Sequence, residues 1–309
     1  GSTAQQETTA SPMRRSDADA PLSISPVSLA LDRPAAQPSV VADPARDRFV
    51  LSWQERDADD CATLRTATLG RDGALGTPRD VARGCDWFVN WADFPSAVVA
   101  DNGDWLTFWL QKTGEGTYAY AVMTRRSTDR GETWAEPQRL HDDASQTEHG
   151  FVALAPAGAD RVRAIWLDGR AMAKPAAEGH DHDHDTHAGH AHHGTMQLLS
   201  RELGRDAFGP EELLDADVCT CCTTDLLRRG NAHLAVWRGR DPGEIRDIHW
   251  AQRAGESWTP QGRVHADDWQ MPACPVNGPA LAAQGETVLV AWPTGAGGEG
   301  LTLKARRLD

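Results

Sequence analysis

Cysteine residues gather at two points in the last third of the chain, and a histidine tract precedes both. Cys219, Cys221 and Cys222 stand just before one apolar stretch, and Cys274 begins the segment Cys-Pro-Val-Asn-Gly just before the next. Sulfur and imidazole side chains share few roles in proteins besides binding metal ions, and cysteine also forms disulfides. We therefore expect a metal site, or a set of disulfides, where successive repeats of the chain begin.

The predicted metal ligands are of two kinds. The thiolates are those of Cys219, Cys221, Cys222 and Cys274. The imidazoles are those of His149 and of a histidine-rich loop at about residues 171–195, namely His180, His182, His184, His187, His190, His192 and His193. Thiolates with imidazoles nearby favour Cu(I) or Zn(II) over hard cations, so copper is the first prediction and zinc the alternative. The loop alternates histidine with aspartate, which is typical of weak, interchangeable sites that collect metal.

Each of these residues also has a simpler interpretation. Cys61 and Cys85 bracket the outer strands of the first repeat, which favours a disulfide between them. The other four cysteines would then either bind metal or form two more disulfides. Cys221 and Cys222 are adjacent and could join only in a strained ring, so one of them is expected to pair with one of the remaining two or to stay free. His149 equally fits a hydrogen bond to a backbone carbonyl, and the histidine tract fits a loop that tolerates insertion.

Composition limits the partners and the compartment. Acidic side chains number 45 and basic ones 31, a net charge of −14 that argues against nucleic acid as a partner. No apolar run reaches the roughly 20 residues that a membrane-spanning helix needs. Residues 1–20 are polar and are predicted to be a disordered tail. The six cysteines and many histidines suit an oxidising compartment, so we expect a periplasmic or cell-surface protein whose signal sequence has been removed.

Short apolar strands that end in tryptophan recur along the chain. They are Phe49–Trp53, Trp105–Trp109, Val162–Trp166, Ala232–Trp237 and Thr287–Trp292. Their tryptophans lie 55 to 57 residues apart, except for one interval of 71 residues that contains the histidine tract. A repeat of this length, with Gly-rich turns and little helical periodicity, is typical of a four-stranded propeller blade. We therefore predict an all-β propeller of five or six blades, with five detectable repeats, as a single domain over residues 21–309.

Propeller topology predicts where the candidate ligands lie. In each repeat a strand of small residues precedes the tryptophan strand, and two outer strands follow it. The loops that enter the inner strands, and those that link the second and third strands, lie on one face around the propeller axis. The cysteine segments and the Glu148-His149 pair lie in loops of the first kind, and the histidine tract lies in one of the second kind. We therefore expect them to converge on one face.

The turn from Ser127 to Trp134, with the pattern Ser-x-Asp-x-Gly-x-Thr-Trp, resembles the Asp-box of sialidase-type propellers. In that motif the Asp accepts backbone hydrogen bonds and the Trp packs between blade strands. Other segments resemble a cysteine-containing bacterial branch of exported sialidase-like proteins, namely residues 91–96, 148–150, 166–170, 218–222, 244–248 and 274–279. Because the family usually has six blades, either a last blade is not included in this chain, or a strand around residues 21–31 completes the fifth blade and closes a smaller ring.

The same resemblance implies sialidase activity, which uses a tyrosine nucleophile assisted by a glutamate, an aspartic acid and three arginines. The chain contains two tyrosines, Tyr118 and Tyr120, on one predicted third strand and far from the late position of the family's nucleophile. The nucleophile is therefore not identifiable, and an enzyme is not the main prediction. Four arginines follow tryptophan strands and could gather, namely Arg170, Arg238, Arg240 and Arg246. Glycoside hydrolysis by two carboxylates, for example those of Asp93 and Asp168, stays open.

The main prediction is an exported propeller that binds a metal ion, sequesters or hands on copper, and has an exported protein as a potential partner. The alternatives are a glycoside hydrolase of the sialidase-like type and a non-catalytic propeller that binds a glycan or a protein. Bound metal, substrate turnover, or neither would distinguish the three.

Overall fold

The computed structural model describes residues 26, 31, 33–173, 194–298 and 300–308. The chain divides into two compact units, residues 1–30 and 31–309, and nearly all of the first lies outside the described residues. The predicted tail and the histidine tract lie outside them as well. Among the described residues, no helix has the length and apolar character needed to cross a membrane.

Strands make up most of the described regular structure. The first two sheets contain β1 (Ala35–Asp43), β2 (Arg48–Arg56), β3 (Ala62–Gly70), β4 (Arg79–Gly84), β5 (Ala97–Val99), β6 (Trp105–Lys112), β7 (Tyr120–Ser127) and β8 (Gln138–Arg139). The next two contain β9 (His149–Pro156), β10 (Val162–Asp168), β11 (Gln197–Leu203), β12 (Glu212–Asp215), β13 (Asp225–Arg229), β14 (Ala232–Arg238), β15 (Ile248–Ala254) and β16 (Trp258–Arg263). The last contains β17 (Ala280–Gln284), β18 (Thr287–Thr294) and β19 (Thr302–Leu308). Two short 3₁₀ helices are η1 (Pro44–Arg46) and η2 (Arg170–Met172).

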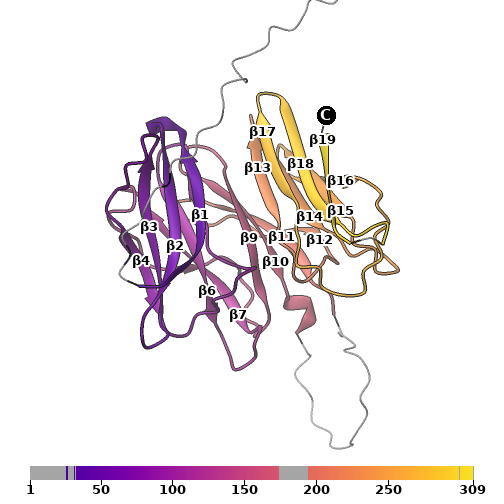
Figure 1. Ribbon diagram of the computed structural model, residues 1–309, viewed down its shortest axis with the longest axis horizontal. Helices are drawn as coiled ribbons and strands as arrows, with labels where there is room; N and C mark the ends of the chain where they lie inside the picture. Colours follow the sequence, from indigo (N-terminus) through magenta and orange to yellow (C-terminus); the bar gives the residue numbers. More distant parts are fainter. Residues whose placement is uncertain (1–25, 27–30, 32, 174–193, 299, 309) are drawn as a thin grey trace, which may run out of the picture. The chain divides into compact units, whose positions relative to one another are not determined.

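Each sheet consists of strands that follow one another in the chain and pair antiparallel with their neighbours, so each sheet occupies one span of the colour bar in Figure 1. The first strand of each sheet contacts the first strand of the next, in the order β1, β5, β9, β13 and β17. Five such sheets around their inner strands are the blades of a β-propeller. The predicted all-β propeller is confirmed, and of the five or six blades expected the described residues form five.

The first and fifth blades show how the ends of the repeat pattern are built. The first blade begins with β1, an inner strand rich in small residues. Among the described residues, the fifth blade has three strands, in the order β17-β18-β19. Most of the segment at residues 21–31, which was considered as a fourth strand for this blade, lies outside the described residues.

The tryptophan strands are the second strands of their blades, as predicted, and their indole groups are almost fully buried. A buried indole N–H needs an acceptor. A side-chain oxygen accepts each one at 2.7 to 3.2 Å, in the pairs Trp53 to Glu55, Trp109 to Gln111, Trp166 to Asp168, Trp237 to Asp215 and Trp292 to Asp267. The tryptophans therefore belong to the core.

The apolar core lies between neighbouring blades. One cluster joins Phe108 of the second blade to Trp166 of the third, and the next joins Ile165 of the third to Trp237 of the fourth. A third cluster joins the fourth and fifth blades. A single blade could not bury both of its faces, so the blades stabilise one another.

The Asp-box-like turn lies between β7 and β8 and has the hydrogen bonds expected of it. The Asp129 carboxylate accepts the Thr133 N–H at 2.8 Å and the Thr133 hydroxyl at 2.5 Å, and these bonds lower the pKa of Asp129 to about 2. Gly131, at a φ of 88°, donates its N–H to the Ser127 hydroxyl at 2.7 Å. Trp134 packs against two clusters that join the first and second blades. The turn therefore fixes the contact between these blades.

Candidate functional site

The loops that enter the inner strands of the fourth and fifth blades meet each other. The segment Cys219–Cys222 precedes β13, and the segment Cys274–Gly278 precedes β17. A Cβ at Gly278 would lie 1.9 Å from the Thr223 carbonyl oxygen, so only glycine allows the second loop to approach the first this closely. The predicted convergence of these two segments is confirmed.

The four sulfurs divide into an inner pair, Cys219 and Cys222, and an outer pair, Cys221 and Cys274. The outer pair is a disulfide whose Cα atoms lie 6.0 Å apart, with Cys274 exposed and Cys221 half-buried. The inner pair consists of free thiols that are 1% and 2% exposed, with their Sγ atoms 3.3 Å apart. The Sγ atom of Cys219 also lies 4.0 Å from that of Cys221.

This pairing corrects the predicted ligand set, because a disulfide sulfur is not a thiolate. Cys221 and Cys274 offer no thiolate in this structure, so only the inner pair remains as candidate thiolate ligands. The predicted disulfide between Cys61 and Cys85 is confirmed.

Arg238, at the end of β14, is 2% exposed and lies beside the inner pair. Its guanidinium donates to the carbonyl oxygens of Asn277 at 2.8 Å, Arg246 at 2.5 Å and Pro293 at 2.8 Å, and it lies 5.0 Å from the centre of the Trp269 ring. Among the described residues, no carboxylate forms an ion pair with Arg238, although a buried cation needs a compensating negative charge. The inner pair, with a hydrogen bond from Arg238 to Cys222, supplies part of that charge, and the carboxylate of Asp247 contributes as well.

The surroundings of the inner pair favour one thiolate. A hydrogen bond from the Cys222 thiol and the positive charges of Arg246 and Arg238 lower the pKa of Cys219 to about 6. Donating that bond, together with burial, raises the pKa of Cys222 well above its usual value. Burial lowers the pKa of Arg238, and the charges of the two sulfurs oppose this effect. Near neutral pH the inner pair therefore holds one proton and one negative charge.

His149, predicted as a ligand, lies in a different cluster. Its Nδ1 atom contacts the carbonyl oxygens of Tyr120 at 3.2 Å and Thr147 at 3.1 Å, and its Nε2 atom lies 3.1 Å from a carboxylate oxygen of Asp143. Burial disfavours a positive charge on His149, but contact with Asp168 outweighs this and raises its pKa. The carbonyl contacts fit the simpler interpretation of His149, a hydrogen bond to a backbone carbonyl, while Asp143, His149 and Asp168 also offer ligand atoms within 4.8 Å of one another.

Asp168, considered as a catalytic carboxylate, is fully buried and fully engaged. It accepts bonds from the Arg170 side chain at 2.7 Å and from the Trp166 indole at 2.8 Å. Burial alone would raise the pKa of Asp168, but the His149 and Arg170 donors outweigh burial and lower the pKa well below its usual range. This carboxylate is therefore not available to a substrate.

The four arginines considered as a cluster are held by other partners. Arg170 pairs with Asp168 and Glu211, and both Arg240 and Arg246 pair with Glu244. Arg238 is occupied by backbone carbonyls.

Sequence reasoning missed a cluster around Tyr120, the acidic cluster, which consists of Tyr120 and the carboxyl groups of Asp93 and Glu148. The Tyr120 hydroxyl contacts Asp93 at 3.1 Å and Glu148 at 2.8 Å, so one hydroxyl bridges two carboxyl groups. Burial raises the pKa of each carboxyl to about 7, although hydrogen bonds from Tyr120 and, for Asp93, from the Phe151 N–H act in the opposite direction. The cluster forms because Tyr120 pairs across the blade boundary with Glu148 in an isolated bridge, which no local pattern reveals.

Two exposed aromatic residues lie close in sequence to members of this acidic cluster. Trp91, two residues before Asp93, is 73% exposed, and Tyr118, two residues before Tyr120, is 59% exposed. Phe88 stacks on Tyr120 at 4.2 Å and contacts Tyr118 at 6.2 Å between ring centres. Tyr120 itself is fully buried, so its hydroxyl is not open to a substrate.

A cavity of about 270 Å³ lies on the inner strands and is lined by residues of several blades. Asp93 from the entry segment of the second blade and Thr223 from that of the fourth line it, together with Phe151 of β9. Entry segments of different blades thus meet around one cavity, as predicted from propeller topology.

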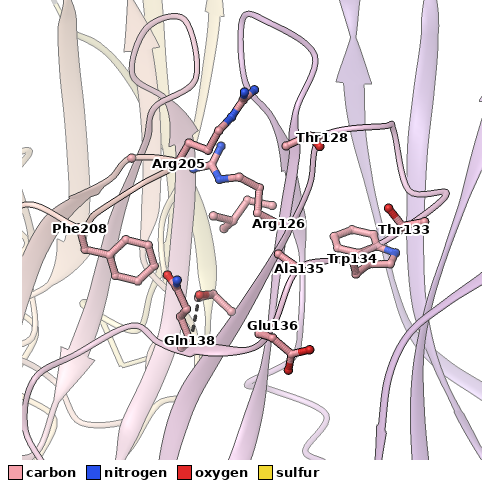
Figure 2. A pocket seen from close by; sticks show the side chains of 12 residues that line it. Arg126, Thr128, Thr133, Trp134, Ala135, Glu136, Gln138, Arg205 and Phe208 are labelled. Carbon is pink, nitrogen blue, oxygen red and sulfur yellow. Dashed lines mark hydrogen bonds between the residues drawn. The ribbon is translucent and has the colours of Figure 1, made fainter.

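A further cavity of about 270 Å³ lies at the outer strands of the second and third blades (Figure 2). Its lining includes Arg126 and Arg205, which Figure 2 shows near one another. Both arginines pair with Asp104, and Arg126 also donates to the Leu203 carbonyl oxygen at 2.8 Å. Both positive charges are therefore paired, and their contacts hold neighbouring blades together.

No protein-family model and no curated protein matches the chain. Among solved structures, a Hadza microbial sialidase is similar at 14% identity, with 79% of this chain and 52% of that chain covered and a TM-score of 0.47. The chain thus spans about half the length of that sialidase. The PL25 ulvan lyase is similar at 13% identity, covering 88% of this chain and 70% of that chain with a TM-score of 0.45. A GH43_1 enzyme from Xanthomonas citri is similar at 12% identity, covering 90% and 88% with a TM-score of 0.46. No residue role in this chain follows from likenesses this distant.

Proposed function

We propose that the protein binds copper, as Cu(I), through the inner pair Cys219 and Cys222. The observation that carries the proposal is a pair of buried thiols, 3.3 Å apart, beside a buried arginine without a carboxylate partner among the described residues. Thiolate sulfur is the ligand type that Cu(I) prefers.

Charge favours Cu(I) over Zn(II) at this place. Two thiolates with Cu(I) carry one net negative charge, which the positive charge of Arg238 balances. Structural Zn(II) sites take four ligands, whereas only two free thiols are present beside the outer disulfide. A zinc site of this kind would therefore need two ligands in addition to the inner pair.

The remaining elements of the proposal come from the sequence. The histidine tract collects copper weakly and raises its concentration near the site. The two disulfides support export to an oxidising compartment, where the protein sequesters copper or hands it to an exported partner. The Asp-box-like turn and the cysteine segments support kinship with exported sialidase-like propellers.

A Cu(I) titration against a coloured chelator, on protein purified without an affinity tag, tests the proposal. We expect one tightly bound Cu(I) per chain in the unaltered protein and in a variant that lacks residues 180–193. Cys219→Ser and Cys222→Ser should each lose it, whereas Thr220→Ser, which changes the same loop without removing sulfur, should keep it. Equal stoichiometry in Cys219→Ser and in the unaltered protein would refute the site.

A second candidate function is glycan processing or binding at the acidic cluster. It is favoured by two carboxyl groups with pKa values near 7 and by the exposed aromatic rings of Trp91 and Tyr118, which lie close in sequence to members of the cluster. Sugars stack on exposed aromatic rings, and a carboxyl group with a raised pKa suits general acid catalysis. Glu148 is the carboxyl that is not fully buried, so it would contact the substrate.

This second candidate is tested with a panel of fluorogenic glycosides and soluble polysaccharides. Turnover that disappears in Glu148→Gln, or binding that disappears in Trp91→Ala, would support it. Leu213→Ala, at an exposed apolar residue of the third blade, is the matched control. Neither binding nor turnover across the panel would reject it.

A further inference from the structure

We propose that the four sulfurs form a thiol–disulfide relay, in which the buried inner pair reduces the outer disulfide and so delivers two thiols to the protein surface. The inference goes beyond the copper site and requires no metal. It assigns a second activity to the same loops, the reduction of external disulfides.

The positions of the sulfurs carry the proposal. The Sγ atom of Cys219 lies 4.0 Å from that of Cys221, and the Sγ atom of Cys222 lies 3.3 Å from that of Cys219. The three atoms thus form a continuous path from the buried side of the loop to the disulfide. Cys274, at the far end, is exposed.

The exchange is balanced without an external oxidant. The Cys219 sulfur attacks the Cys221 sulfur, which forms a Cys219–Cys221 bond and breaks the Cys221–Cys274 bond. Cys274 leaves as a thiolate and takes up a proton from solvent. Cys222 then gives up its proton and attacks Cys219, which forms the Cys219–Cys222 disulfide and releases Cys221, and Cys221 takes up that proton. Two electrons and one proton have moved from the inner pair to the outer pair, and the second proton comes from solvent.

The surface thiols then act on an external disulfide of a small thiol or a protein. Cys274 attacks it, forms a mixed disulfide and releases one thiol. Cys221 attacks the mixed disulfide, releases the second thiol and restores the Cys221–Cys274 bond. In one turnover the external disulfide becomes two thiols and the inner pair becomes a disulfide.

Labelling of the native protein with a polymer-linked maleimide tests the relay, because the reagent is too large to reach a buried thiol. The experiment is run with a copper chelator, so that its outcome is independent of the copper site. We expect label on Cys221 and Cys274, and a Cys219–Cys222 disulfide, when peptides are mapped by mass spectrometry. No label on the native protein, or label on the inner pair with the outer disulfide intact, would overturn the proposal.

Two variants show the direction of the exchange. Cys219→Ser should lower the labelling rate of Cys274 by about tenfold or more, because the attacking sulfur is absent. In Cys222→Ser the exchange should stop after its first step, with a Cys219–Cys221 disulfide formed and Cys274 labelled. Addition of 2-hydroxyethyl disulfide to the unaltered protein should release two thiols per chain. Release at the same rate from Cys219→Ser would also overturn the relay.

Discussion

Arg238 shows how one residue connects the fold to the site. It is almost fully buried, donates to three backbone carbonyl oxygens, two of them in the segments around β17 and β18, and supplies the positive charge beside the inner pair. Losing it would remove the donor from three backbone carbonyl oxygens and one of the two cations, with Arg246, that lower the pKa of Cys219.

Arg238→Met is therefore expected to lower the free energy of unfolding by about 3 kcal/mol or more, since removing one member of a buried charged network leaves the others unpaired. Arg240→Met, two residues later, is the control, because Arg240 is half-buried and pairs with a partly exposed glutamate. That change should cost no more than about 1 kcal/mol. Urea unfolding measures both, and equal losses would contradict this role of Arg238.

Asp93 makes the stability of the fold depend on pH. Its pKa is about 7 in the folded protein, above the value in an unfolded chain, so the folded state holds a proton that the unfolded state has released. The resulting stabilisation is complete below about pH 4 and is lost as the pH rises through about 7, with an upper bound of about 4 kcal/mol.

Asp93→Asn should accordingly flatten the fall in unfolding free energy between about pH 4 and pH 7, the window between the unfolded and folded pKa values of Asp93. Asp129→Asn is the control, because the pKa of Asp129 is about 2 and its stabilisation is lost only as the pH falls through that value. An unchanged pH slope in Asp93→Asn would show that Asp93 is ionised throughout this range.

At the scale of elements, the turn between β7 and β8 and the turn between β15 and β16 offer a matched comparison, because both contain the pattern Gly-Glu-x-Trp, at Gly131 and at Gly255. Both contain a glycine at positive φ, Gly131 at 88° and Gly255 at 108°. A Cβ at Gly131 would lie 2.5 Å from the Trp105 ring, whereas a Cβ at Gly255 meets nothing within 4 Å. An alanine at either position would therefore carry the backbone strain of a positive φ, but only an alanine at position 131 would also clash with a neighbouring side chain.

Gly255→Ala is expected to cost about 1 kcal/mol from the positive φ alone. Gly131→Ala should cost about 1 to 3 kcal/mol more, because the buried Trp105 ring must shift. Thermal and urea unfolding measure the difference, and equal costs would mean that the Trp105 ring yields without strain.

The elements also show what local sequence can and cannot reveal. The tryptophan strands were predictable because an apolar run ending in Trp, with an acceptor two residues later in the first three blades, satisfies its own indole N–H. The Cys61–Cys85 disulfide was predictable because both residues flank the same pair of strands. The Tyr120 cluster and the Arg238 contacts were not, since they join residues of different blades through bonds that no periodic pattern encodes.

At the scale of the whole molecule, the outer disulfide ties the fifth blade to the fourth. It spans 53 residues, and Asp225 of β13 accepts the Leu281 N–H of β17 at 2.7 Å nearby. Propeller topology predicted that the cysteine loops meet. Which cysteines form the disulfide depends on Cα and Cβ positions, and the spacing of the cysteines along the sequence does not give these.

Replacing the outer pair by Cys221→Ser with Cys274→Ser should cost up to about 4 kcal/mol and speed amide exchange in β17, β18 and β19. Replacing Cys61 and Cys85, which close a loop of 24 residues, should cost about 3 kcal/mol and speed exchange in β3 and β4 instead. Hydrogen exchange followed by mass spectrometry separates the two. If either replacement speeded amide exchange equally in β3–β4 and in β17–β19, the two disulfides would not stabilise separate blades.

The copper site is tested most directly by X-ray absorption at the copper edge, on Cu(I)-loaded protein that lacks residues 180–193. The account predicts a shell of sulfur ligands alone, which disappears together with the bound copper in Cys219→Ser. A shell of nitrogen and oxygen atoms, or copper that the Cys219→Ser variant still holds, would contradict it.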